Sequence, residues 1–124
     1  MAEAKKNTVM IVDDEPSILG VLEEFLKRDG FKVLTAVNGR DAVDKAKKEK
    51  IDLALVDMAM PVLNGTETML ELKKLNPEIA VIMVTAYRDA EKVVEALKLG
   101  AVDVIFKPFD LKHVRESIRG TLME

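Results

Sequence analysis

Five short apolar runs, rich in valine and isoleucine, recur along this chain at regular intervals. They are VMIV (9–12), KVLTA (32–36), LALV (53–56), AVIMV (80–84) and VDVIF (102–106). Their length and β-branched content predict strands. Because they are continuously apolar instead of alternating with polar residues, they are typical of a parallel sheet covered by helices on both faces. The chain is therefore predicted to be an α/β protein.

Between these runs the apolar residues change to the period of an amphipathic helix. The pattern includes Ile18, Val21, Leu22, Phe25 and Leu26, then Ala90, Val93, Val94 and Leu97, and finally Leu111, Val114, Ile118 and Leu122. Gly30 and Gly100 follow two of these helices, where we expect left-handed caps. Strands that alternate with helices through right-handed crossovers predict an open, doubly wound five-stranded sheet with five helices.

Composition limits the classes of function. The 124 residues suit one domain, and we expect a tail over residues 1–7 and the domain over residues 8–124. The absence of cysteine excludes disulfides, thiol nucleophiles and thiolate metal sites. The net charge of −3, with dispersed basic residues, argues against a nucleic-acid partner, and we interpret the lysine-rich segment 44–50 as the solvated side of a helix. No apolar run approaches the about 18 residues that cross a membrane, so we expect a cytoplasmic protein without a membrane partner.

Reactive side chains stand where the predicted strands end. Asp13 and Asp14 end the first strand, Asp57 the third and Thr85 the fourth, and Lys107 follows the fifth. Doubly wound sheets bind ligands just beyond the carboxyl ends of their strands. If strands one, three, four and five are neighbours, these side chains meet at one edge.

Each of these side chains also has an ordinary structural explanation. Asp14 or Glu15 could cap a following helix, Asp57 could cap a turn, Thr85 could fill a strand and Lys107 could lie at the surface. The set is harder to explain this way, because two carboxylates about 4 Å apart repel by on the order of 4 kcal/mol at an effective dielectric of 20. A divalent cation would offset the repulsion. Oxygen ligands without histidine or cysteine indicate Mg²⁺, with Mn²⁺ as the alternative.

The remaining groups suit phosphoryl transfer. A partly free Asp57 carboxylate is a nucleophile of the kind that forms an acyl phosphate. The metal, the Lys107 ammonium and the Thr85 hydroxyl would stabilise the negative charge of the phosphoryl oxygens. The sequence therefore predicts a protein that accepts phosphate on an aspartate.

Four motifs carry a resemblance to a known family. VDDEP (12–16), DMAMPVLNG (57–65), TAY (85–87) and KPF (107–109) have the order and spacing of the receiver domain of two-component response regulators, which the chain resembles over about residues 8–122. The resemblance implies a flavodoxin-like fold with strand order 2-1-3-4-5. It also implies that Asp57 takes a phosphoryl group from a phosphohistidine on a sensor histidine kinase or histidine phosphotransfer protein.

The same resemblance assigns the other site residues. Asp13, Asp14 and Asp57 would bind Mg²⁺ with help from the main-chain carbonyl of Ala59. Thr85 and Lys107 would hold the phosphoryl oxygens and couple phosphorylation to a shift of the fourth helix. By this analogy the chain catalyses only its own phosphorylation and dephosphorylation. The downstream protein target is not identified by the sequence.

Local details around the site are also predicted. Pro61 and Gly65 bound a tight loop in which Asn64 and Gly65 tolerate positive φ. We predict a cis peptide before Pro108 that turns Lys107 toward the acids.

One position departs from the family, which often has an aromatic residue or histidine three positions before the lysine. This chain has Val104 there, so output through helix four, strand five and helix five is expected to be weaker or differently built. Tyr87 is expected beside the site, mainly in packing. Since the sequence ends at Glu124, we expect either a stand-alone receiver or an excised domain.

Three other interpretations fit the sequence less well. Haloacid dehalogenase-type phosphatases need a second aspartate two residues after the nucleophile, where this chain has Ala59. A flavin or nucleotide carrier needs a phosphate-binding loop after the first strand, where Asp13 and Asp14 would repel a bare phosphate. An inactive receiver is disfavoured because all the expected reactive side chains are present.

Overall fold

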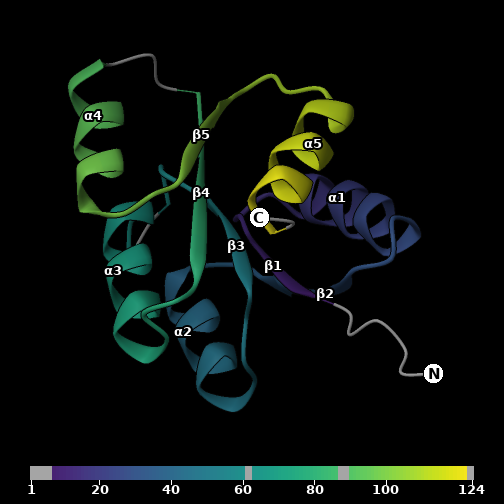
Figure 1. Cartoon of the computed structure of the whole chain (residues 1–124), viewed down its shortest axis with the longest axis horizontal. Helices are drawn as coiled ribbons and strands as arrows, with labels where there is room; N and C mark the ends of the chain where they lie inside the picture. Colours follow the sequence, from purple (N-terminus) through teal and green to yellow (C-terminus); the bar gives the residue numbers. More distant parts are fainter. Residues whose placement is uncertain (1–6, 61–62, 87–89, 123–124) are drawn as a thin grey trace.

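The chain forms one parallel sheet with helices on both faces, seen in a computed structural model that describes residues 7–60, 63–86 and 90–122 (Figure 1). The strands are β1 (Thr8–Val12), β2 (Lys32–Ala36), β3 (Leu53–Asp57), β4 (Ala80–Thr85) and β5 (Asp103–Phe106). The helices are α1 (Pro16–Arg28), α2 (Gly39–Lys48), α3 (Gly65–Leu75), α4 (Ala90–Leu99) and α5 (Leu111–Leu122). The strand order is β2-β1-β3-β4-β5. The predicted α/β class, strand order and five helices are confirmed for the described part of the chain.

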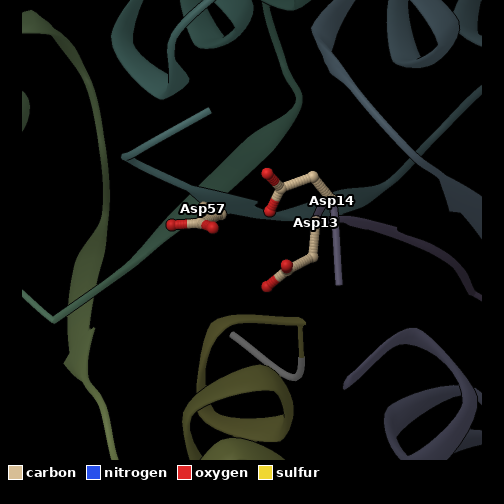
Figure 2. Close-up of side chains that lie close together, drawn as sticks. All are labelled: Asp13, Asp14 and Asp57. Carbon is tan, nitrogen blue, oxygen red and sulfur yellow. The ribbon is translucent and has the colours of Figure 1, made fainter. Parts of the chain in front are cut away.

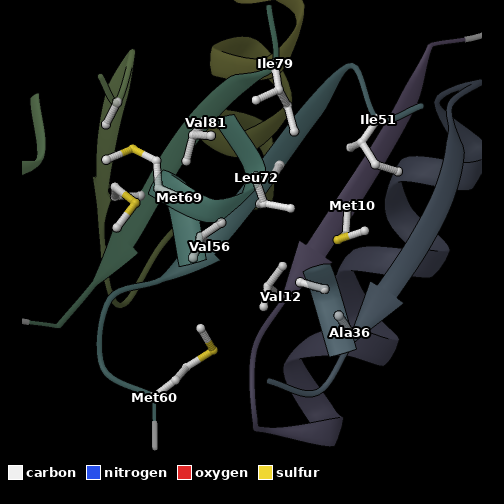
Figure 3. Packing of buried hydrophobic residues seen from close by; sticks show 14 of the residues in the cluster. Met10, Val12, Ala36, Ile51, Val56, Met60, Met69, Leu72, Ile79 and Val81 are labelled. Carbon is white, nitrogen blue, oxygen red and sulfur yellow. The ribbon is translucent and has the colours of Figure 1, made fainter. Parts of the chain in front are cut away.

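The helices divide between the two faces of the sheet. Helices α1 and α5 cover one face, and α2, α3 and α4 cover the other (Figure 1). Successive strand residues alternate between these layers. Val9 and Ile11 pack toward α1 and α5, whereas Met10 and Val12 pack toward the other helices (Figure 3). Because β1 and β3 are buried along their whole length, these central strands need apolar residues on both faces. The edge strands β2 and β5 are partly exposed and include Lys32 and Asp103.

The register aligns the carboxyl ends of the central strands. Val12 pairs with Val56 across β1 and β3, and Thr85 pairs with Phe106 across β4 and β5. All four strands run in the same direction, so the residues that follow them lie at the same edge. This edge is where the predicted reactive side chains are found.

Helix ends follow the sequence signals closely. Gly30 has a φ of 96° and Gly100 a φ of 125°, which confirms both predicted left-handed caps. Helix α3 begins with a capping box, in which the Asn64 side chain accepts from the Glu67 backbone N–H and the Glu67 carboxylate accepts from the Asn64 N–H. Such a box satisfies two backbone donors that a helix start leaves without partners.

The apolar stripes of two helices are only partly buried. Val21 on α1 is 53% exposed, and Val94 and Leu97 on α4 are 46% and 44% exposed. Helix α4 lies over the edge strand β5, and its one fully buried side chain among the described residues is that of Ala96. Helical period predicts which residues share a face, but it does not tell how much of that face the neighbouring elements cover.

Among the described residues, no helix has the length and apolar character required to cross a bilayer.

Candidate functional site

Three aspartates from two strand ends converge at the carboxyl edge of the sheet. Figure 2 shows Asp13 and Asp14, which follow β1, beside Asp57, which ends β3. One carboxylate oxygen from each residue lies within 4.8 Å of the other two. Asp13 and Asp57 are 3% and 6% exposed, whereas Asp14 is open to solvent. The structure thus brings together the three carboxylates that the sequence predicts as metal ligands.

Backbone donors fix the two buried carboxylates. The Glu15 N–H donates to Asp13 Oδ1 at 2.9 Å, and the Ala59 N–H donates to Asp57 Oδ1 at 3.1 Å. Glu15 is the N-cap residue of α1, but its side chain makes no capping hydrogen bond. The ordinary explanation of this acidic run as a side-chain helix cap is therefore wrong for Glu15.

Lys107 supplies the positive charge of the site. Its Nζ lies 3.3 Å from Asp13 Oδ2 and 3.4 Å from Asp57 Oδ2, and the side chain is 18% exposed. Its backbone N–H donates to the Thr85 carbonyl at 2.8 Å, which continues the β4–β5 ladder into the site. The peptide bond to Pro108 is cis, as predicted. The lysine therefore points toward the acids and not to the surface.

The charges at this edge do not balance. Burial raises the pKa of Asp57, and the negative charge of Asp13 raises it further. The Ala59 N–H and the Lys107 ammonium favour the ionised carboxylate and lower the pKa, but burial outweighs them. For Lys107, burial disfavours the charged form, but the carboxylates of Asp57 and Asp13 outweigh burial and raise its pKa. One ammonium thus faces three carboxylates. A hard divalent cation fits this set of oxygen donors, because Mg²⁺ is commonly bound by a few carboxylates together with water.

Thr85, Ala59 and Val104, the other residues singled out in the sequence, lie on or directly after the strands β3, β4 and β5. Thr85 ends β4 and is completely buried. Ala59 follows β3 by two residues and is exposed, and its N–H donates to the Asp57 carboxylate. The binding of a metal by the Ala59 carbonyl and the phosphoryl contacts of Thr85 stay predictions. Val104 is partly buried against the cluster under α2, α3 and α4.

The loop after β3 differs from expectation in its backbone. Asn64 has a φ of −69° and serves as the N-cap of α3, so the predicted positive φ is wrong there. Gly65 does not have positive φ either. A Cβ on Gly65 would lie 2.5 Å from the Asp57 carbonyl oxygen and 2.6 Å from Met58 Cα. The glycine is thus required because α3 begins directly against the strand end that carries Asp57, a role the sequence analysis missed.

Two predicted residues lie outside the described residues. These are Pro61 and Tyr87. The capping-box pattern of Asn64 and Glu67, by contrast, was visible in the sequence as an N-x-x-E signal and was not used.

A doubly wound sheet with an acidic cluster and a lysine at its carboxyl edge defines the class of molecule. The family model described as the response regulator receiver domain matches residues 9–119. The chain therefore belongs to the receiver domain family of two-component systems.

Known relatives agree in sequence and in structure. Sporulation initiation phosphotransferase F of Bacillus subtilis is 35% identical, over 90% of this chain and 90% of the relative. The transcriptional regulatory protein ZraR of Escherichia coli is 37% identical over 92% of this chain, but the match spans only 26% of that protein's length.

Among solved structures, the CheY-like receiver domain protein of Methanospirillum hungatei has a TM-score of 0.91 and 33% identity, covering 95% of this chain and 94% of that one. The structure named as the CheX-CheY-BeF3-Mg+2 complex of Borrelia burgdorferi has a TM-score of 0.89 and 28% identity, covering 95% of this chain and 90% of that one.

Proposed function

We propose that this domain accepts a phosphoryl group on Asp57 in a Mg²⁺-dependent reaction and then relays it or switches conformation. The proposal rests on the position of the Asp57 carboxylate, which lies beside both other aspartates and 3.4 Å from the Lys107 ammonium. The donor would be a phosphohistidine on a sensor histidine kinase or a histidine phosphotransfer protein. Sporulation initiation phosphotransferase F supports this role by its name and by its match over nearly its full length.

The proposed step is a single displacement at phosphorus. An Asp57 oxygen forms a bond to phosphorus as the bond from phosphorus to the donor imidazole nitrogen breaks, and that nitrogen keeps the electron pair and takes a proton from solvent. Lys107 and the Thr85 hydroxyl stabilise the charge on the phosphoryl oxygens. When bound, Mg²⁺ would neutralise further charge on those oxygens. Asp13 and Asp14 would hold the ion, and Mn²⁺ could replace it.

Loss of the phosphoryl group would follow the same geometry. A water oxygen attacks phosphorus, and the bond to Asp57 breaks to give back the carboxylate and inorganic phosphate. We propose that the domain catalyses only these reactions of its own aspartate. The position two residues after Asp57 carries the methyl side chain of Ala59, which cannot protonate the leaving group of an external phosphoester.

The test uses acetyl phosphate as a small phosphodonor. With Mg²⁺, intact-mass spectrometry should show one added phosphoryl group that hydroxylamine removes, as expected of an acyl phosphate. Asp57→Asn should abolish it, whereas Asp44→Asn, which removes an exposed carboxylate from α2, should not. Chelation of the metal should also prevent it. Labelling that persists in Asp57→Asn would refute the assignment.

Output is proposed to pass through the outer surface of α4. Val94 and Leu97 on this helix are exposed, as is Val102 before β5. Val104 stands where the family often has an aromatic residue or histidine. The signal would therefore be carried by movement of α4 itself and not by a change in the position of an aromatic side chain. Phosphorylation that leaves the α4 amide resonances of the chain unchanged would contradict this route.

A further inference from the structure

Helices α2 and α3 enclose an apolar groove on the face of the sheet that α4 also covers. One part of the groove is a hollow of about 560 Å³ with Val43, Leu63 and Leu70 among its lining residues. A second hollow of about 260 Å³ lies further along the same two helices, where Ala46 and Leu75 contribute. Together they have the dimensions of sites that take several side chains of a ligand.

The groove leaves two large leucines in contact with water. Leu70 and Leu75, both on α3, are 37% and 44% exposed. Leu70 lines the first hollow and Leu75 lines the second, so each hollow has a partly exposed leucine of α3 in its wall. An elongated apolar surface of this kind, rimmed by charged residues, is typical of a docking site for a protein segment.

The rim of the groove is basic in a chain whose net charge is −3. Arg40, Lys73 and Lys74 line the first hollow and Lys50 lines the second. Lys50 belongs to the lysine-rich segment at the end of α2, which the sequence analysis assigned to solvent. The rim therefore collects cations from both helices.

The two acids of the rim are engaged within the chain. The Glu67 carboxylate accepts from the Asn64 N–H in the capping box, and Glu71 pairs with Lys74 at 3.1 Å. Arg40, by contrast, makes no ion pair or hydrogen bond with any other described residue. Lys74 is the partner of Glu71 in that pair, and the Lys73 ammonium donates to the Ile79 carbonyl at 3.3 Å. The cations left to meet an occupant are therefore Arg40 and Lys50.

We propose that this α2–α3 groove binds an acidic amphipathic helix of a partner protein. Apolar side chains at helical spacing would fill the two hollows, and flanking aspartates or glutamates would face Arg40 and Lys50. This is the helix-in-groove mode, in which apolar anchors give affinity and charge selects the partner. The groove does not include the aspartates, so the inference is independent of the proposed phosphorylation.

The test maps a defined probe onto the isotope-labelled chain by NMR. The probe is a helical peptide of about 15 residues, with leucines at i, i+3, i+4 and i+7 and glutamates at the flanking positions. Its partner peptide has the same leucines but lysines in place of the glutamates. The glutamate peptide should shift amides of α2 and α3, and the lysine peptide should bind at least about tenfold more weakly.

Matched variants separate the groove from the rest of the surface. Arg40→Glu and Leu70→Asp should each weaken the glutamate peptide by about tenfold, as expected for central interface residues. Lys112→Glu and Leu97→Asp change an exposed lysine and an exposed leucine on α5 and α4, and they should leave binding unchanged. Circular dichroism of each variant establishes that it is folded.

Four results would overturn the proposal. They are equal binding of the two peptides, shifts that centre on α4, absence of binding at the highest soluble peptide concentration, and an unchanged affinity in Leu70→Asp. Light scattering adds a fifth, because a dimer that Leu70→Asp dissociates would show that a second copy of the chain fills the groove.

Discussion

Replacing Asp14 with asparagine removes one negative charge from a site that holds three. The carboxylate oxygens of Asp13, Asp14 and Asp57 lie within 4.8 Å of one another. At 4.8 Å each pair repels by about 3.5 kcal/mol at an effective dielectric of 20 and by about 0.9 kcal/mol in bulk water. Because Asp14 is exposed, the lower value applies to its interactions. Two such repulsions, partly offset by the nearby Lys107, leave a net gain of about 1 kcal/mol for the Asp14→Asn variant without metal.

The assay is thermal unfolding followed by circular dichroism, first with a chelator and then with excess Mg²⁺. For a domain of this size, 1 kcal/mol corresponds to a rise in melting temperature of about 4 °C. With Mg²⁺ the difference in melting temperature should narrow or reverse. Ligand at 100 times its dissociation constant stabilises a protein by about 2.7 kcal/mol, and the variant lacks one of the three proposed metal ligands.

The matched control is Asp44→Asn, which removes the same charge from an exposed position on α2. It should change the melting temperature little in either condition. The reasoning is refuted if Asp14→Asn in chelator melts at or below the temperature of Asp44→Asn. In that case Lys107 and the backbone N–H groups already neutralise the aspartates before any metal binds.

Two further predictions concern Asp57 and the start of α3, which packs against it. Since burial raises the pKa of Asp57 above its usual 3.8, the folded chain keeps a proton that the unfolded chain has lost just above pH 3.8, and stability falls as the pH rises through that window. Urea unfolding in chelator should therefore show an advantage of Asp57→Asn that grows as the pH rises from 3.8; an advantage independent of pH would contradict the raised pKa. Gly65→Ala should destabilise the fold by about 2 kcal/mol or more, because the new Cβ would lie 2.5 Å from the Asp57 carbonyl oxygen. Gly20→Ala, with nothing within 4 Å of the new Cβ, should stabilise it by up to about 1 kcal/mol; equal urea midpoints for the two variants would count against the close approach.

The sheet was predictable because its strands are buried on both faces. Every residue of β1 and β3 is buried, so each strand appears in the sequence as an uninterrupted apolar run. The parallel direction of the strands then placed Asp13, Asp57 and Thr85 at the same edge of the sheet. Their convergence also required β1, β3 and β4 to be neighbours, which the family resemblance supplied, since the carboxyl ends of parallel neighbours lie together.

Other features depend on distances that the sequence does not encode locally. The placement of Lys107 between two carboxylates depends on how the segment after β5 turns. A lysine at this position does not by itself predict that placement, whereas the family resemblance of the motif KPF did. Gly65 appeared to serve a turn conformation, yet its real constraint is a neighbouring backbone 2.5 Å away. Exposure of Val21, Val94 and Leu97 depends on how far the adjacent elements reach over each helix, which periodicity cannot report.

Helix α4 is anchored far more lightly than its counterparts. Helix α1 buries three leucines, Leu19, Leu22 and Leu26, each contributing about 2 kcal/mol, whereas α4 buries the single methyl group of Ala96. Displacing α1 would thus cost more than displacing α4, whose outer surface is already in contact with water. If Asp57 is phosphorylated as proposed, α4 is the helix that can change position at the least cost in buried apolar surface.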